Sequence, residues 1–308
     1  MAHSIKALLP FVGEKPIDRL HNDTLVPFIE ARRRAGLATG TINKDLSVVR
    51  RILNLAARVW RDESGLSWLS APPLIQMLKG PRRRPYPLSW DEQTLLFKEL
   101  PDYLARMCLF KVNAGLREQE VCRLRWDWEI RVPELDTSVF VIPGYAHKNG
   151  EDRLVVLNRI ASSVLEEQRG KHRQWVFAYD GRPFHRLYCT AWKNARVRAA
   201  KRYEAELECP CPDGFKRVRI HDLKHTFGHR LRAAGVSLED RQDLLGHKSD
   251  RITTHYSAPD IARLVEAANK VCEQRHTVLR VIVPQAVTQK SRTKLTQRAG
   301  VARVLLGD

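Results

Sequence analysis

The segment RIHDLKHTFGHRLRAAG places His221 and Lys224 three positions apart near the expected start of a helix. Asp222 is positioned to cap this helix and Gly235 to end it. The buried stripe of the helix is then Leu223, Phe227 and Leu231, at i, i+4 and i+8. His221 and Lys224 can both project from the exposed N-terminal end. A cation and an imidazole beside a helix N-terminus suit the binding of a phosphate.

The stretch LLGHKSDRITTHYS carries His247 and, nine positions later, Tyr256. The helix before it is expected to open with a capping box of Ser237 and Asp240 and to end at Gly246. His247 therefore falls on a turn, where its side chain can be aimed at a site. Tyr256 comes just before the next expected helix. Taken by itself, a tyrosine in such a place is most often a packing residue, so its assignment depends on the neighbouring motifs.

Two further segments carry charged residues in well-defined places. In NAGLREQEVCRLRW, Arg117 stands at a helix start and Glu120 follows one turn later. The runs SVFVIPG and DRLVVLN, rich in β-branched residues, flank the turn YAHKNGED. They predict a β-hairpin with Lys148 in its turn.

The first part of the chain is expected to be helical, most clearly in TINKDLSVVRRILNLAARVWRDE. Apolar residues recur there every three or four positions, at Leu46, Val49, Leu53, Ala56 and Trp60. The opposite face carries basic residues, which include Lys44, Arg50 and Arg51. Such a face is equally consistent with a solvated surface and with one that contacts DNA.

Composition limits the class of protein. The 308 residues include 53 Lys and Arg against 35 Asp and Glu, a net charge of +18 that suits a polyanionic partner, nucleic acid being the commonest. A merely basic protein without such a partner is the alternative.

The N-terminus lacks the features of a secretory signal, and no stretch is long enough to span a bilayer. Six irregularly spaced cysteines indicate reduced thiols in a cytoplasm. The C-x-C pair in CPCPDG lacks a second pair, so we expect no metal.

The expected domain organisation follows from one linker. The stretch APPLIQMLKGPRRRPYPLSWDE combines prolines with Arg82, Arg83 and Arg84, a composition typical of an exposed linker. We therefore expect, in chain order, a helical domain, a basic linker, a second domain that opens at Ser89 and Glu92, and a basic tail without sustained periodicity. Their ranges are 1–82, 83–87, 88–275 and 276–308.

Taken in order, these motifs resemble those of the tyrosine recombinase (phage integrase) family. The string GLR-x-x-E is followed by a hairpin lysine, then H-x-L-[basic]-H-T, then L-G-H, then a tyrosine nine residues later. The resemblance covers residues 88–257, and the helical segment before it resembles the family's core-DNA-binding domain more weakly. It implies a mainly α fold with a small β-sheet, made of a helical core-DNA-binding domain and an α+β catalytic domain that clamp duplex DNA as a C shape.

The resemblance also implies roles for individual residues. The phosphate clamp corresponds to Arg117, His221, Lys224 and His247, supported by Glu120. Lys148 corresponds to the general acid and Tyr256 to the nucleophile, which would form a 3′-phosphotyrosine. No metal or other cofactor is needed, because cations and donors already face the charge that develops in the transition state. Lys44, Arg50, Arg51, Arg82, Arg83 and Arg84 are the DNA-binding candidates.

One position departs from the family pattern, since Lys224 stands where most members have a second arginine. Lysine keeps the charge but loses the planar fork that binds two phosphate oxygens. A benign substitution is favoured over a damaged site.

The resemblance implies site-specific recombination that integrates or excises a mobile element, on double-stranded DNA sites paired by a homotetramer in the cytoplasm, with no membrane involved. Two alternatives stay open. One is a DNA-binding regulator with the same fold and impaired catalysis, and the other is an enzyme that nicks and reseals DNA as a type IB topoisomerase does. The chain also starts too close to the core-binding pattern to hold the additional arm-binding domain of many integrases.

Overall fold

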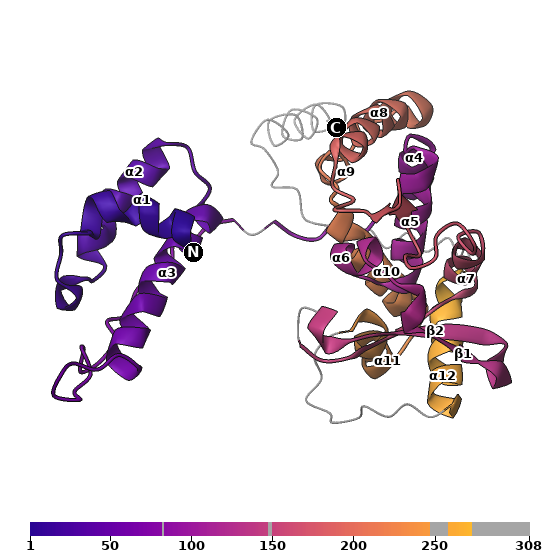
Figure 1. Cartoon of the computed structure of the whole chain (residues 1–308). Coiled ribbons are helices and arrows are strands. Elements are labelled where there is room, and N and C mark those ends of the chain that lie inside the picture. The colour runs from indigo at the N-terminus through magenta and orange to yellow at the C-terminus, as the bar shows by residue number, and fades with distance from the viewer. Residues whose placement is uncertain (82, 147–149, 247–257, 273–308) are drawn as a thin grey trace, which may run out of the picture. The chain divides into compact units, whose positions relative to one another are not determined.

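The computed structural model describes residues 1–81, 83–146, 150–246 and 258–272. The chain divides into two compact units, Met1–Arg84 and a second one that begins at Pro85 (Figure 1). Each has a hydrophobic core of its own. None of the helices within these ranges is both long and apolar enough to cross a membrane. The basic tail, 276–308, lies outside the described residues.

The first unit is helical. Its elements are α1 (Ala2–Val12), η1 (Ile17–Arg19), η2 (Asp23–Leu25), α2 (Val26–Arg34) and α3 (Thr39–Arg58). The amphipathic pattern expected for α3 is confirmed, because Leu46, Leu53 and Ala56 are fully buried against the other helices. Beyond α3 the chain continues without regular structure, and Asn43 fixes part of it through hydrogen bonds to both backbone groups of Leu78, at 2.8 and 2.9 Å.

The second unit combines helices with a small sheet, so the expected mainly α fold with few strands is confirmed. Its helices are α4 (Trp90–Lys98), α5 (Asp102–Ala114), α6 (Glu118–Cys122), α7 (Arg159–Glu166), α8 (Thr190–Leu207), α9 (Asp213–Lys216), α10 (Ile220–Ala233), α11 (Leu238–Leu245) and α12 (Ala258–Asn269). The short 3-10 turns are η3 (Trp126–Trp128), η4 (Pro133–Leu135), η5 (Gly144–Ala146) and η6 (Lys270–Cys272).

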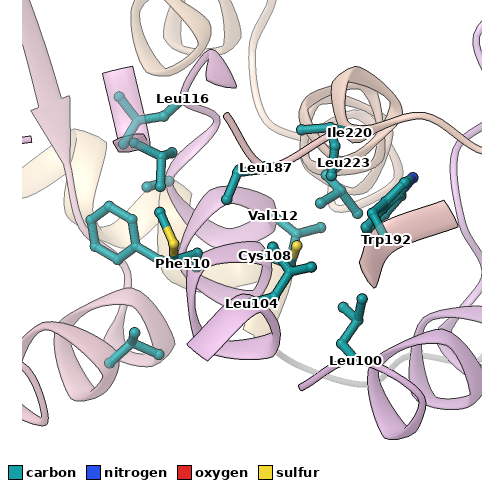
Figure 2. Close-up of a cluster of buried hydrophobic side chains, with 14 of the residues drawn as sticks. Leu100, Leu104, Cys108, Phe110, Val112, Leu116, Leu187, Trp192, Ile220 and Leu223 are labelled. Atoms are coloured by element: carbon teal, nitrogen blue, oxygen red, sulfur yellow. The ribbon is translucent and has the colours of Figure 1, made fainter. Parts of the chain in front are cut away.

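The central helix of this unit is α5, which is buried on most of its surface. Val112 of α5, Leu223 of α10 and Trp192 of α8 lie side by side in the largest hydrophobic cluster (Figure 2). All three side chains are completely buried. The core thus fixes the N-terminal half of α10, on which His221 and Lys224 lie, against the helix that leads to Arg117.

The sheet is antiparallel, in the order β1-β2-β3, with β1 at Glu129–Val132, β2 at Thr137–Ile142 and β3 at Arg153–Val156. The expected hairpin is β2 and β3, with Val139 opposite Val156 and Ile142 opposite Arg153. The sequence did not predict β1, nor the two-residue strands β4 (Ala178–Tyr179) and β5 (Arg182–Pro183). β1 alternates poorly, because only Val132 of its four residues is buried.

Strands β2 and β3 are covered on both faces. Val139 and Val156 pack into a cluster with residues of α10, α11 and α12. Phe140 and Val155 point to the other side, into the large core around α5. Because β3 is packed on both sides, its first residue, Arg153, lies inside the protein, where it is 3% exposed.

Helix caps decide where the functional helices begin. The capping box of Ser89 and Glu92 and the Ser237 cap of α11 are confirmed. The expectation that Asp222 caps α10 is wrong: the N-cap is Arg219, and Asp222 is the third helical residue, whose carboxylate accepts from Arg219 N at 2.8 Å. A buried carboxylate there compensates the N–H groups of the first turn as a cap would.

Candidate active site

Four of the residues singled out by their motifs lie in the second unit within the described part of the chain. They are Arg117, Glu120, His221 and Lys224. Lys148, His247 and Tyr256 lie outside the described residues, as does Arg82 of the linker. The geometry of the site is therefore built from the α5–α6 junction, α10, β3 and the end of α11.

Arg117 and Glu120 form a closed pair at the start of α6. The Glu120 carboxylate accepts from the Arg117 backbone N–H at 2.6 Å and from its guanidinium at 2.9 Å. Burial acts to raise the pKa of Glu120, but Arg153 and the two bonds from Arg117 outweigh it and hold that pKa below its usual value. Glu120 is therefore a carboxylate that fixes the rotamer of Arg117.

Lys224 does not project into solvent, contrary to the expectation from its place near a helix start. It is 5% exposed, and its ammonium donates to the carbonyl of Leu245 at 2.5 Å. The reason is its position one turn into α10, on the side that packs against α11. His221, at the start of α10, is solvent-exposed as expected.

Three cations converge on the C-terminal end of α11. Leu244 O lies 3.5 Å from Arg153, Leu245 O accepts from Lys224, and Gly246 O accepts from Arg117 at 3.3 Å. Carbonyls at a helix end lack intrahelical partners and carry the negative end of the helix dipole, so cations stabilise them. Side chains from β3, α10 and the α6 N-cap thus fix the backbone that leads directly to His247.

Sequence reasoning missed two buried cations of this site, Lys111 and Arg153. The ammonium of Lys111, on α5, donates to the carbonyl of Leu116, the residue before Arg117. Arg153 donates to the Glu120 carboxylate and, at 3.1 Å, to Gly115 O. A signal was available, because Lys111 interrupts the apolar run in CLFKVNAG and Arg153 directly precedes the apolar run in DRLVVLN. A charge inside a buried strand or helix indicates a specific partner.

The described site holds more positive than negative charge. Lys111, Arg117, Arg153 and Lys224 lie around the carboxylate of Glu120, and Glu118 adds a second carboxylate near Lys111. Burial, followed by the charges of Arg153 and Arg117, lowers the pKa of Lys224 to about 6. Burial likewise lowers the pKa of Lys111 to about 8. An anion placed among these groups would raise both pKa values, so the site favours an anionic ligand.

A pair of histidines lies at the N-terminal end of α10. The rings of His221 and His225 meet edge to face with centroids 4.8 Å apart. Partial burial, then His225 and Lys111, lower the pKa of His221 to about 4. In the absence of an anion, His221 is therefore a neutral imidazole at physiological pH, able to donate one hydrogen bond.

Two glycines permit the close packing at the ends of α5 and α11. Gly115 ends α5 with φ +63°, and a Cβ there would come within 2.7 Å of the Phe227 ring. Gly246 ends α11 with φ +56°, and a Cβ there would fall on the guanidinium of Arg153. The glycines of the GLR and LGH motifs are thus required by left-handed backbone and by contact.

The described DNA-binding candidates lie on the surface, and the cysteine pair gives no metal site. Lys44, Arg50 and Arg51 of α3 are exposed, as are Arg83 and Arg84 of the linker. Within the described ranges no group of three or more His, Cys, Asp or Glu side chains could hold a metal ion. Cys209 is exposed and Cys211 is buried.

Comparison with known proteins agrees with this architecture. Residues 88–263 match the model of the phage integrase family. The chain is 26% identical over 281 residues to the integrase of Salmonella phage P22, a match that covers 84% of this chain and 66% of that protein. It is also 26% identical over 265 residues to the tyrosine recombinase XerC of Xanthomonas campestris pv. campestris strain B100, covering 83% of this chain and 76% of the relative.

Among solved structures, a lambda integrase dimer bound to a COC′ core site has the same fold, with a TM-score of 0.57 and 14% identity over 91% of this chain and 73% of that one. The fold and the site define a helical protein with a small sheet and a cluster of basic side chains around the Glu120 carboxylate. This chain belongs to the phage integrase family, the tyrosine recombinases.

Proposed function

We propose that this chain is a site-specific DNA recombinase that cuts and rejoins duplex DNA through a 3′-phosphotyrosine intermediate. The observation that carries the proposal is the cluster of the buried Lys111, Arg153 and Lys224 and the partly exposed Arg117 around the Glu120 carboxylate. An excess of buried cations is costly unless an anion joins them, and a scissile phosphate is an anion that the family's chemistry supplies.

In the proposed reaction, the Tyr256 hydroxyl gives its proton to solvent water and its oxygen attacks the phosphorus atom, while the bond to the 5′ oxygen breaks and the phosphotyrosine forms. Lys148 donates a proton to the departing 5′ oxygen. Arg117, Lys224, His221 and His247 stabilise the charge on the nonbridging oxygens. The covalent bond conserves the energy of the broken phosphodiester, so a different 5′ hydroxyl can reverse the step and exchange strands without ATP.

The partner is double-stranded DNA that carries a recombination site, and a homotetramer pairs two such sites. The basic residues of α3 and of the linker, Lys44, Arg50, Arg51 and Arg82 to Arg84, contact DNA phosphates. The reaction integrates or excises a mobile element and takes place in the cytoplasm. The division into domains follows the linker: residues 1–82 bind the core DNA, 88–275 carry the catalysis, and 276–308 form a basic tail.

The experiment starts from a pool of nicked duplexes of random sequence, incubated with the protein without metal or ATP. Protein-linked DNA that survives denaturation is sequenced to recover the site. Two differently labelled duplexes with that site are then mixed with the protein. Joined duplexes carrying both labels support a recombinase. A supercoiled plasmid is treated in parallel, and its relaxation with no joined products would indicate a topoisomerase. DNA binding without any covalent adduct would indicate a regulator.

A further inference from the structure

Arg153 is a buried arginine that the proposed chemistry does not use. It begins β3, and its side chain is 2% exposed. Burial, only partly offset by Glu120, lowers its pKa to about 10. Burying a guanidinium is costly unless its charge and its donors are matched, so its partners indicate what it does.

The partners of Arg153 belong to three different elements. One side of the guanidinium donates to the Glu120 carboxylate of α6. The other side donates to Gly115 O, at the end of α5, at 3.1 Å, and lies 3.5 Å from Leu244 O of α11. With its side chain 2% exposed and its guanidinium directed at these protein oxygens, Arg153 is assigned a role through its partners and not through contact with the phosphate.

Two chains of contacts lead from Arg153 to residues of the proposed reaction. Through Glu120 it reaches Arg117, whose guanidinium bonds the same carboxylate at 2.9 Å. Through Leu244 it reaches the backbone that runs on to Gly246 and His247. The close packing of Gly246 against the guanidinium, where a Cβ would overlap it, reinforces this second route.

We propose that Arg153 is a positioning residue for strand cleavage. Its guanidinium orients the Glu120 carboxylate that fixes Arg117 and, at the same time, fixes the end of α11 from which His247 follows. Strand β3 thereby couples Arg117, the N-cap of α6, to the end of α11. The inference rests on the proposed function, because it assigns Arg153 a part in that reaction.

The test compares three variants at a temperature at which all are folded: Arg153→Met, Arg153→Lys and the control Arg230→Met. Arg230 is also a buried arginine of this unit, at 9% exposure, but its partners are Gln93 at 2.8 Å and the Trp90 ring. DNA affinity and the single-turnover rate of covalent-complex formation are measured on a suicide duplex at saturating DNA.

We expect Arg153→Met to keep its DNA affinity within about threefold while cleavage slows on the order of 100-fold, the cost of a displacement of about 1 Å at a reacting centre. Arg153→Lys should recover part of the rate, and Arg230→Met should keep it within about threefold. Equal slowing in Arg153→Met and Arg230→Met would overturn the inference, because it would show a general effect of a lost buried arginine.

A double-mutant cycle with Glu120→Gln tests the route through the carboxylate. If Arg153 acts through Glu120, the losses of cleavage rate in the two single variants should overlap. The double variant should then cleave no more than about threefold more slowly than the slower single variant. Full multiplication of the two losses would overturn this route.

Amide hydrogen exchange supplies a readout that does not depend on cleavage. Arg153→Met should speed exchange in peptides containing Leu244 and Leu245 and in those containing Gly115 to Glu120, and Arg230→Met should not. Unchanged exchange in Arg153→Met would overturn the inference. A parent protein that forms no covalent complex would instead refute the proposed function, so the two failures are distinguishable.

Discussion

The Lys224 ammonium donates to the carbonyl of Leu245 at 2.5 Å, which ties the second turn of α10 to the end of α11. Once a phosphate has restored its ammonium form, Lys224 has three donors, so this bond leaves two for the phosphate. Lysine at this position therefore caps α11 and, in the proposed reaction, supplies a charge for the clamp. The departure from the family's arginine is compatible with an intact site.

The first prediction concerns proton uptake by Lys224. Arg153, Arg117 and Lys111 face it with like charge and Glu120 with opposite charge, and burial is the main reason that its pKa falls from 10.5 to about 6. Between these two pH values the unfolded chain binds more protons at Lys224 than the folded chain, so this residue makes the free energy of unfolding rise with pH.

Binding of a DNA phosphate restores the ammonium, so DNA binding should take up close to one proton at Lys224 near pH 7.5, and affinity should fall as pH rises. Calorimetry in two buffers of different ionisation enthalpy measures this uptake. Lys224→Arg, which stays charged, should take up correspondingly less. Equal uptake by the parent and Lys224→Arg would refute the assignment.

The second prediction concerns the charge at position 224. Lys224→Ala should lose most of the recombination activity, because the clamp loses a cation and Leu245 O loses its donor. Lys224→Arg should keep or raise activity, since either cation satisfies the charge. The measurement is the rate of joined-product formation at saturating DNA. Full activity in Lys224→Ala would remove this residue from the clamp.

The third prediction separates backbone strain from contact at the end of α11. Gly246 and Gly235 both have positive φ, but a Cβ at Gly235 would meet nothing within 4 Å, whereas one at Gly246 would meet Arg153. Gly235→Ala should cost about 1 kcal/mol of unfolding free energy from backbone alone. Gly246→Ala should cost about 3 kcal/mol and also slow cleavage, because it displaces the guanidinium.

Denaturant unfolding of both variants, followed by cleavage assays on the folded proteins, checks this difference. Matching stability losses with unimpaired cleavage in Gly246→Ala would show that the contact with Arg153 carries no function.

The fourth prediction concerns the basic linker. DNA binding should weaken steeply with salt, because phosphate contacts release counterions. Replacing Arg82, Arg83 and Arg84 together by Ala should weaken binding to all sequences and reduce the slope of log affinity against log salt by up to about 3. Fluorescence anisotropy over a salt series measures the slope. Loss of affinity for one sequence alone would indicate base reading instead.

Much of the fold could be predicted because local signals specify it. The apolar stripe of α3, the Ser89 and Ser237 caps, and the β2–β3 hairpin are short-range patterns, and the structure has all of them. β1 was missed because its side chains are mostly exposed and show no alternation. Its identity as a strand comes from pairing with β2, a tertiary contact that no local pattern encodes.

The site was only partly predictable for the same reason. Arg117 and Glu120 stand in one motif and interact within one turn, so spacing alone indicates their pairing. Arg153 lies 33 positions from Glu120, and its role follows from the packing of β3 against α6 and α11. Lys224 was expected on the surface because its position in the helix predicts the direction of its side chain. That position does not predict that α11 covers the side chain.

The last prediction concerns Tyr256, the proposed nucleophile, and it separates chemistry from folding. Tyr256→Phe removes one oxygen, so the free energy of unfolding and the DNA affinity should change little, whereas the covalent complex should disappear. A nicked substrate whose cleaved fragment diffuses away traps the intermediate, and a denaturing gel of parent and variant on the same DNA displays it. A packing tyrosine would tolerate the change and leave the band in both lanes, which would assign the nucleophile elsewhere.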